Sequence, residues 1–363
     1  MPDQKNVRVA IILEGSLGDS LMALPTIRLV ASKYGWENTS LISLDPNSTL
    51  NASSILGQRL PLLKCKNVFR NHPIQFFRSV ANWLEVAWLL LVDKVDVCIY
   101  ALREEDPEDF ESRSKVHSRI LRLSRVKVLG LERKPINSAH GSSHKLQIGL
   151  ATFSRICRAL DLNEQIEVFD FSFPSSAKDK EVAENWLSDR GISDSRCVAI
   201  CNSSKTAAQR WPLENFEAVV TEITKLDPEM NFVLVGSSED SAEFQSLRKV
   251  TTRLHALGQP EVGVSAEVMR RCIAYLGNDT GPMHLAASVG TKCFAIFSGR
   301  NPKGEWYPLG AEHFIHESSV ECAGCRLSEC SEFHYKCLTK ITPQQVMASW
   351  RRRFDKGNNL GVV

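Results

Sequence analysis

The chain has 363 residues, of which 43% are hydrophobic and 24% charged, and its formal net charge is +2. This length is enough for two domains that each bury a core. The near balance of charge argues against a protein that binds nucleic acid through bulk positive charge. No basic segment followed by an apolar run precedes the first strand pattern, so we expect a cytoplasmic protein without a secretory signal.

The first strand and helix follow directly. Residues Val7–Leu13 form a near-continuous apolar, β-branched run, which is typical of a parallel strand buried on both faces. A turn with Gly15 and Gly18 comes next, and apolar residues then recur with helical spacing from Leu21 to Val30. This strand, turn and helix predict the opening unit of a nucleotide-binding fold. The third glycine of the dinucleotide fingerprint is absent, which disfavours an NAD site.

The turn places a carboxylate, Asp19, at the start of the helix and at the carboxyl end of the first strand. In open α/β sheets this edge is where ligands bind. Two interpretations remain open from the residues alone, a helix cap and a catalytic base.

Strand and helix patterns alternate through the rest of the first half. We predict strands at Ser40–Leu44, Val95–Tyr100 and Val126–Leu131, helices at Ile74–Val92 and Ile148–Leu160, and a charged loop with a surface helix over Arg103–Arg125. The apolar stretch Trp83–Val92 is about half the length needed to span a bilayer. Burial in the first domain is the favoured interpretation, and contact with a lipid acceptor or a membrane face is the alternative.

The pattern restarts after Phe169–Ser176, which ends in Pro-Ser-Ser and is the best candidate for a linker. We predict helices at Glu181–Arg190, Leu213–Leu226, Glu239–Val250 and Thr342–Phe354, strands at Cys197–Cys201, Phe232–Val235 and Phe294–Phe297, and a polar loop over Asn202–Arg210. The fold class is therefore α/β, with two doubly wound Rossmann-like domains facing across a cleft. The run Arg351–Arg353 is better explained as a solvated helix end than as a membrane patch.

The stretch Gly277–Ser288 lies between two short apolar segments and reads as the end of a strand followed by a helix. Pro282 occupies the first turn, where a missing N–H costs nothing. Small residues at Thr280 and Gly281 would leave backbone N–H groups open to a phosphate, with Asp279 just ahead of them. The alternative is an ordinary capped helix.

Four cysteines lie within sixteen residues near the C-terminus, at Cys322, Cys325, Cys330 and Cys337. In a reducing compartment this spacing favours a structural zinc or iron site of four thiolates, with His334 as a substitute ligand. A disulfide or free thiols are the alternatives. The set offers no open position for a catalytic metal, and none is expected.

Several motifs together resemble the glycosyltransferase family 9 enzymes, the ADP-heptose:lipopolysaccharide heptosyltransferases. The resemblance rests on five segments: the Gly-x-x-Gly-Asp turn of Gly15–Asp19, the Gln209–Pro212 segment, the Val233–Gly236 strand, Asn278–His284 and Gly299–Gly310. The resemblance covers essentially the whole chain. It implies a GT-B fold with an acceptor-side domain at 1–174, a donor domain at 175–341, and a final helix and tail at 342–363 that cross back.

The resemblance also implies transfer of a heptose, with inversion, from a nucleotide diphosphate sugar such as ADP-heptose to a saccharide, glycolipid or protein acceptor. Asp19 becomes the candidate base, and no Asp-x-Asp pair is present for a metal clamp. The acceptor-side loop would include Gly15, Ser16 and Gly18. The donor would contact Ser203, Ser204, Lys205, Gln209, Arg210, Asp279, Thr280, Gly281 and His284. No nucleic acid partner is expected, and peripheral contact with the inner membrane face is a further option.

One position departs from the family pattern. The family commonly has a basic pair before the tryptophan, whereas this chain has Gln209 and Arg210. Lys205 is a candidate for the missing charge. Three alternatives follow: another nucleotide sugar, an epimerase, or a protein that binds a nucleotide sugar without catalysis.

Overall fold

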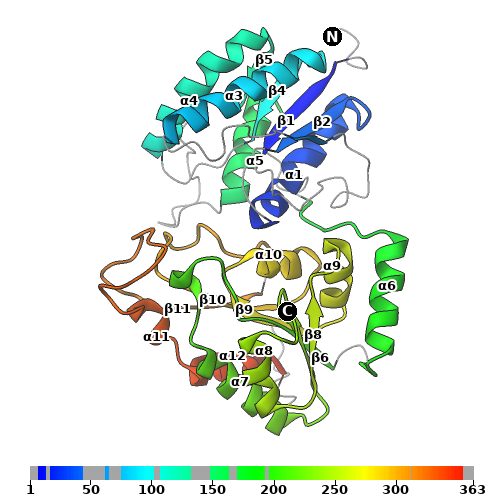
Figure 1. Ribbon diagram of the computed structural model, residues 1–363, viewed down its shortest axis with the longest axis vertical. Helices are drawn as coiled ribbons and strands as arrows, with labels where there is room; N and C mark the ends of the chain where they lie inside the picture. Colours follow the sequence, from blue (N-terminus) through cyan, green and yellow to red (C-terminus); the bar gives the residue numbers. More distant parts are fainter. Residues whose placement is uncertain are drawn as a thin grey trace. The chain divides into compact units, whose positions relative to one another are not determined.

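The computed structural model describes residues 7–13, 17–43, 62–64, 75–101, 107–131, 148–162, 170–192, 196–310 and 312–354. The chain divides into two compact units, Met1–Pro174 and Ser175–Val363 (Figure 1). Each unit contains a parallel sheet with helices on its faces. The predicted α/β class with two Rossmann-like domains is confirmed.

Unit 1 has a five-stranded sheet in the order β3-β2-β1-β4-β5. The strands are β1 (Val9–Leu13), β2 (Thr39–Ser43), β3 (Leu62–Lys64), β4 (Val97–Tyr100) and β5 (Lys127–Leu129). The helices are α1 (Leu17–Tyr34), α3 (Gln75–Val92), α4 (Pro107–Leu121) and α5 (Ile148–Ala159), with a 3-10 turn, η2 (Arg122–Ser124), after α4. Every residue of β1 is buried, as its continuous apolar run predicts.

The two faces of this sheet carry different helix pairs. Helices α1 and α5 pack together, and α3 packs against α4 and η2. Trp83, Val86 and Leu90 of α3 form a core with Ile12 of β1 and Tyr100 of β4. The inner face of the apolar stretch at residues 83–92 is therefore buried in unit 1, as we favoured from the sequence.

Unit 2 has a six-stranded sheet in the order β11-β10-β9-β6-β7-β8. The strands are β6 (Cys197–Cys201), β7 (Asn231–Val235), β8 (Leu254–Gly258), β9 (Ala274–Asn278), β10 (Cys293–Phe297) and β11 (Phe314–Glu317). The helices are α6 (Ala177–Ser188), α7 (Leu213–Leu226), α8 (Ala242–Val250), α9 (Val262–Arg270), α10 (Gly281–Ser288), α11 (Lys336–Thr339) and α12 (Pro343–Phe354), with a 3-10 turn, η4 (Ala207–Gln209), before α7.

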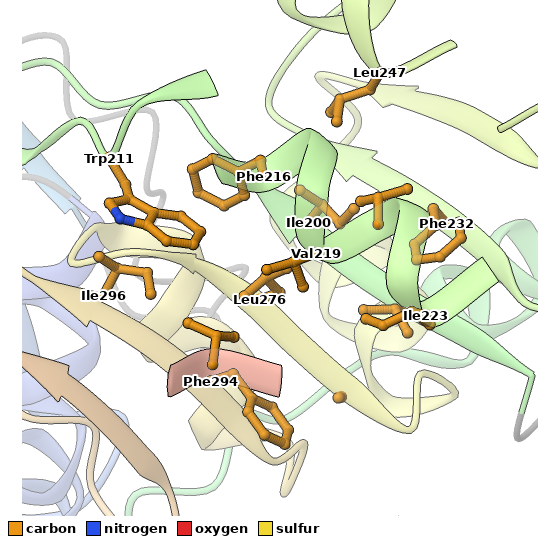
Figure 2. Packing of buried hydrophobic residues seen from close by; sticks show 14 of the residues in the cluster. Ile200, Trp211, Phe216, Val219, Ile223, Phe232, Leu247, Leu276, Phe294 and Ile296 are labelled. Carbon is orange, nitrogen blue, oxygen red and sulfur yellow. The ribbon is translucent and has the colours of Figure 1, made fainter. Parts of the chain in front are cut away.

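The core of unit 2 gathers apolar side chains from β6, β7, β9, β10 and α7 (Figure 2). Trp211 lies at one end of it, edge-on to Phe216 with ring centroids 5.0 Å apart. Its indole Nε1 donates to the carbonyl of Ile341 at 2.9 Å, so the buried nitrogen is satisfied. Helix α12 packs against α7 and β11. The predicted return of the final segment to the first domain stays a prediction.

Four elements of unit 2 were not predicted from the sequence: β8, α9, β11 and α11. Strand β8 was not predicted, because it lies at the edge of the sheet and only its first and fourth residues are buried. Helix α9 was not predicted either, because it begins Val-Gly-Val and both residue types disfavour helix. Gly263 is needed there, since a Cβ would collide with the Asp179 carboxylate of α6. Tertiary packing therefore overrides local propensity at this helix.

Candidate functional site

The order of strands in unit 2 defines where a ligand would bind. From β6 the chain adds β7 and β8 on one side, then crosses to add β9, β10 and β11 on the other. Strands β6 and β9 are therefore neighbours at the point where the order reverses. Ligands in open parallel sheets bind outside the carboxyl ends of the strands at such a point. The segments that leave this edge are Asn202–Arg210 after β6 and Asp279–His284 after β9.

A rigid frame supports this edge. Asn278 is fully buried, its Nδ2 donates to the carbonyl of Asn202 at 2.8 Å, and its Oδ1 accepts the backbone N–H of Trp211 at 3.0 Å. Gly277 lies so close to β6 that a Cβ there would come 2.6 Å from the carbonyl oxygen of Cys201. The Asn278 side chain thus ties the end of β9 to the loop after β6 at Asn202 and Trp211. The missing side chain of Gly277 lets β9 approach β6 closely.

Asp279 lies at the centre of the edge and is 6% exposed. Gln209 donates its Nε2 both to the Oδ2 and to the backbone carbonyl of Asp279, each at 3.0 Å. Burial raises the pKa of this carboxyl to about 7, against the opposing influence of Gln209, Arg300 and Asn301. At neutral pH the protonated and ionised forms are therefore both populated, so the carboxyl can donate as well as accept a hydrogen bond.

Helix α10 begins beside Asp279 without a side-chain cap. Thr280 precedes the helix in an extended conformation and makes no capping bond to it, and Pro282 lies in the first turn as predicted. The Thr280 hydroxyl instead donates to the Asn278 carbonyl at 3.3 Å. The alternative expected from the sequence, a helix whose N-terminus is capped by a side chain, is therefore not observed. The first N–H groups and the positive end of the helix dipole suit an anion.

The loop after β6 brings its polar and basic residues to the same edge. Cys201 Sγ lies 3.7 Å from the Ser203 hydroxyl and 3.8 Å from the Thr280 hydroxyl. Arg210 donates its Nε to the carbonyl of Ser204 at 2.8 Å, which fixes the loop. Lys205 and Arg210 are both exposed, so their charges remain accessible to an anionic ligand.

His284 was expected among the donors because it lies one turn along α10. It is 2% exposed, and its ring lies edge-on to Trp306 with centroids 6.1 Å apart. Burial lowers the pKa of His284 to about 3, so the ring is neutral at physiological pH. Its Nδ1 is buried without a hydrogen-bond partner in the described part of the chain. In the chain without a ligand His284 therefore carries no positive charge, and its contact with the donor stays a prediction.

A third segment, after β10, was not assigned a role from the sequence. Arg300 and Asn301 both lie near Asp279, and each opposes the rise in the pKa of its carboxyl. The Arg300 Nε donates to the carbonyl of Leu327 at 2.8 Å, and Arg326 pairs with the buried Glu305 at 2.8 Å. The only sequence signal was that residues 299–310 match a family landmark. Arg300 of this segment is a positive charge close enough to Asp279 to lower the pKa of its carboxyl.

Cys322, Cys325 and Cys330 lie on the loop that supports this segment, and Cys337 lies in α11 directly after it. Gly324 and Arg326 of that loop donate their backbone N–H groups to the carbonyls of Gly299 and Arg300. Burial raises the pKa of the Cys337 thiol, and the thiols of Cys322, Cys330 and Cys325 add to the shift, so each of these three lies near enough to Cys337 to affect its charge. All four are free thiols, and the predicted disulfide alternative does not form. Over the described residues, no group of three or more histidine, cysteine, aspartate or glutamate side chains is arranged to hold a metal ion.

In unit 1, Asp19 lies in the first turn of α1 and is partly exposed. Helix α1 follows β1, which lies between β2 and β4 at the point where the strand order of this sheet reverses. Gly18 is buried in the same turn. Gly15 and Ser16 lie outside the described residues. Asp19 therefore occupies in unit 1 the edge that Asp279 occupies in unit 2.

A family model described as glycosyltransferase family 9 (heptosyltransferase) matches residues 123–336. The chain is 23% identical over 149 residues to lipooligosaccharide heptosyltransferase 2 of Campylobacter jejuni. It is 25% identical over 146 residues to lipopolysaccharide heptosyltransferase 2 of Escherichia coli K12. Each match covers 39% of this chain, and they cover 45% and 41% of the two relatives. The chain thus spans less than half the length of the curated relatives it matches.

Solved structures resemble the chain over nearly its whole length. E. coli ADP-heptose lipopolysaccharide heptosyltransferase II aligns with a TM-score of 0.64 and 15% identity, over 95% of this chain and 98% of that one. A family 9 glycosyl transferase from Veillonella parvula aligns with 0.67 and 18%, over 96% and 97%. The iron-containing dodecameric glycosyltransferase TibC from enterotoxigenic E. coli aligns with 0.50 and 12%, over 96% and 76%. These likenesses establish the GT-B fold, and the family match over more than half of the sequence shows that the chain belongs to glycosyltransferase family 9, the heptosyltransferases.

Proposed function

We propose that the protein is an inverting glycosyltransferase that moves a heptose from a nucleotide diphosphate sugar, ADP-heptose, to a hydroxyl of a saccharide, glycolipid or protein acceptor. The observation that carries the proposal is the edge of unit 2, where Asp279, Thr280 and Gly281 open α10 beside Gln209. Family membership supports the sugar-transfer chemistry. The heptosyltransferase names of the curated relatives support heptose as the sugar.

In this proposal unit 2 holds the donor. The N–H groups at the start of α10 would receive the diphosphate, whose negative charge grows as the bond to the sugar breaks. Arg210 and Lys205 are exposed on the neighbouring loop and would add positive charge. Ser203 and Ser204 supply hydroxyl groups on the same loop. No step in this scheme requires a metal ion.

Unit 1 would hold the acceptor, with Asp19 as general base. The acceptor hydroxyl gives its proton to the Asp19 carboxylate as its oxygen forms a bond to the anomeric carbon of the sugar. The bond between that carbon and the diphosphate oxygen breaks on the opposite face, and the nucleoside diphosphate leaves. Attack opposite to the leaving group inverts the anomeric configuration. Gly18 and the residues of the same turn would shape the acceptor loop.

The test is turnover of a panel of ADP-, GDP- and UDP-sugars by the wild type and by Asp19→Asn. We expect turnover with ADP-heptose, and a decrease of roughly 10²–10⁴ in kcat for Asp19→Asn, because the amide cannot accept the proton. Nucleotide affinity, measured by calorimetry, should be nearly unchanged, since Asp19 belongs to the other unit from the proposed donor site. Unchanged turnover in the variant would remove Asp19 from the mechanism.

A non-catalytic protein that binds a nucleotide sugar is the second candidate, favoured by one observation. Gln209 stands where the family commonly has a basic residue, and its side chain is engaged with Asp279. Nucleotide binding without transfer or hydrolysis in the same panel would support this candidate. Release of nucleotide from a UDP-sugar, or interconversion of sugar epimers, would instead favour another donor or an epimerase.

We also propose that the protein is cytoplasmic and that the four cysteines bind a structural zinc or iron ion. Free thiols throughout the described residues support a reducing compartment. The iron-containing TibC supports a metal in this fold, and the nearness of Cys322, Cys325 and Cys330 to Cys337 supports the ligands. The described arrangement is not a closed ligand set, so the thiols would have to move together on binding. Elemental analysis that finds no stoichiometric zinc or iron would contradict the proposal.

A further inference from the structure

The outer face of α3 is apolar although it is open to solvent. Leu84, Trp88 and Leu91 recur at helical spacing and are 46%, 59% and 50% exposed. Helix α4 and η2 pack beside α3 and carry two further exposed apolar side chains, Val116 and Leu123. We call these five residues the α3 patch. Most of the large apolar side chains that unit 1 exposes among its described residues lie in this patch or next to it.

The buried face of α3 determines how the helix is rotated about its axis. The opposite face of α3 buries Trp83, Val86 and Leu90 in the core, where the Trp83 ring stacks on His117 of α4 with centroids 3.9 Å apart. Helix α3 therefore has a fixed rotation, and its second apolar face is left without a partner. An exposed cluster that contains a tryptophan on a helix is typical of a surface that contacts another phase or molecule.

Positively charged side chains lie on the elements that carry the α3 patch, or directly after them. Arg119 on α4, Arg122 on η2 and Arg125 directly after it are all exposed, and none of them forms an ion pair with another described residue. The acidic groups nearby are less available. Glu85 is only partly exposed, and the Asp96 carboxylate accepts the backbone N–H of Arg8 at 2.9 Å. Exposed apolar side chains together with basic ones match the interface of a membrane that carries anionic lipids.

We propose that the α3 patch docks unit 1 onto an anionic lipid surface, with Trp88 and Leu91 entering the headgroup region and the arginines contacting lipid phosphates. A second copy of the chain is a poorer occupant, because a two-fold contact through this face would bring the same arginines together. No helix in the described ranges is long and apolar enough to cross a membrane.

The other basic cluster of the protein, at the end of α12, does not compete for this role. Arg351 lies 3.7 Å from Glu222, and Arg352 lies over the Phe314 ring at 5.4 Å from its centroid. Arg353 lies over the ring of Phe354 in the same way. Each of these three guanidinium groups thus has an acidic or aromatic partner within unit 2, whereas the arginines on α4 and η2 and after them have no acidic partner in the described chain.

The test is flotation of the full chain with vesicles of phosphatidylcholine alone or with phosphatidylglycerol. We expect binding only to the anionic vesicles, and binding that weakens with added salt. The double variant Trp88→Ser with Leu91→Ser should reduce partitioning by about tenfold or more, because the apolar area that enters the lipid is lost. Arg119→Gln and Arg122→Gln should each reduce it about fivefold.

Matched controls are available in unit 2. Leu226 is as exposed as Leu91, at 50%, so Leu226→Ser should float like the wild type. Arg352→Gln should do the same. Circular dichroism checks that each variant is folded. Binding is read without turnover, so a failure here is separable from a failure of the proposed activity.

Three results would overturn the proposal. The first is a wild type that does not float with anionic vesicles. The second is flotation that the patch variants leave unchanged. The third is a wild type that forms dimers in sedimentation experiments and becomes monomeric with the two serine substitutions, which would assign the patch to a second copy.

Discussion

The buried carboxyl of Asp279 makes a quantitative prediction about stability and pH. Burial raises its pKa from an ordinary value near 3.8 to about 7. The folded state therefore keeps a proton on Asp279 at pH values where the unfolded state has lost it. This contribution to stability is fully present below about pH 4 and is lost as the pH rises towards 7. The replacement Asp279→Asn keeps the shape of the side chain and removes the titration.

The magnitude follows from the size of the shift. Between pH 5 and pH 8, a carboxyl with these two pKa values lowers the free energy of unfolding of the wild type by roughly 2 to 3 kcal/mol relative to the variant. Any constant cost of the substitution, such as a weaker bond to Gln209, is the same at each pH. The free energy of unfolding of the variant, relative to that of the wild type, should therefore increase as the pH rises, whatever the difference between them at pH 5.

The assay is urea unfolding of both proteins at pH 5, 6, 7 and 8, monitored by circular dichroism. The free energy of unfolding is compared for the transition whose midpoint the substitution changes. The two units can unfold separately, so that transition must be analysed by itself. Asp240→Asn, which replaces an exposed aspartate of the same unit, serves as control and should show no such trend. If the difference in free energy of unfolding between the wild type and Asp279→Asn is the same at pH 5 and pH 8, the reasoning is refuted.

Two further substitutions test the frame beneath Asp279. Asn278→Ala should lower the free energy of unfolding by roughly 2 to 5 kcal/mol, because the buried Asn202 carbonyl and the Trp211 N–H both lose their partner. A loss below about 1 kcal/mol in urea unfolding would show that water or relaxation replaces both bonds. Gly277→Ala should cost roughly 1 to 3 kcal/mol, since the new methyl group would push β9 away from the Cys201 carbonyl. A variant as stable as the wild type would mean that the strands separate easily there.

Much of the fold could be predicted because local patterns and tertiary packing agree. The buried strand Cys197–Cys201 and the amphipathic helix Leu213–Leu226 begin and end where their apolar residues indicate. The local pattern does not predict an element whose residues are only partly buried, or one that depends on a close contact with a distant part of the chain. Strand β8 exposes part of its length at a sheet edge, and α9 depends on Gly263 to approach α6. A single sequence does not reveal such neighbours.

The candidate site divides in the same way. Gln209 and Asp279 could be singled out from their motifs, and the structure joins them by hydrogen bonds. His284 was expected among the residues that bind the donor; burial lowers the pKa of its ring to about 3, which the sequence did not indicate, and its contact with the donor stays a prediction. Arg300 and Asn301 act on Asp279 from the segment after β10, and no local sequence pattern indicates that this segment lies close to Asp279. Their roles could not be predicted from spacing along the chain.

The sequence by itself determined the alternation of strands and helices, the two-domain α/β class and the family, because each of these depends on residues close together along the chain. Tertiary structure alone decided which groups meet at the edge of unit 2, and the charge that each of them carries. It also decided that α3 has an inner face in the core and an outer face in solvent. The reason is physical. Propensity and periodicity act over a few residues, whereas burial and electrostatic shifts depend on neighbours that only the folded chain brings together.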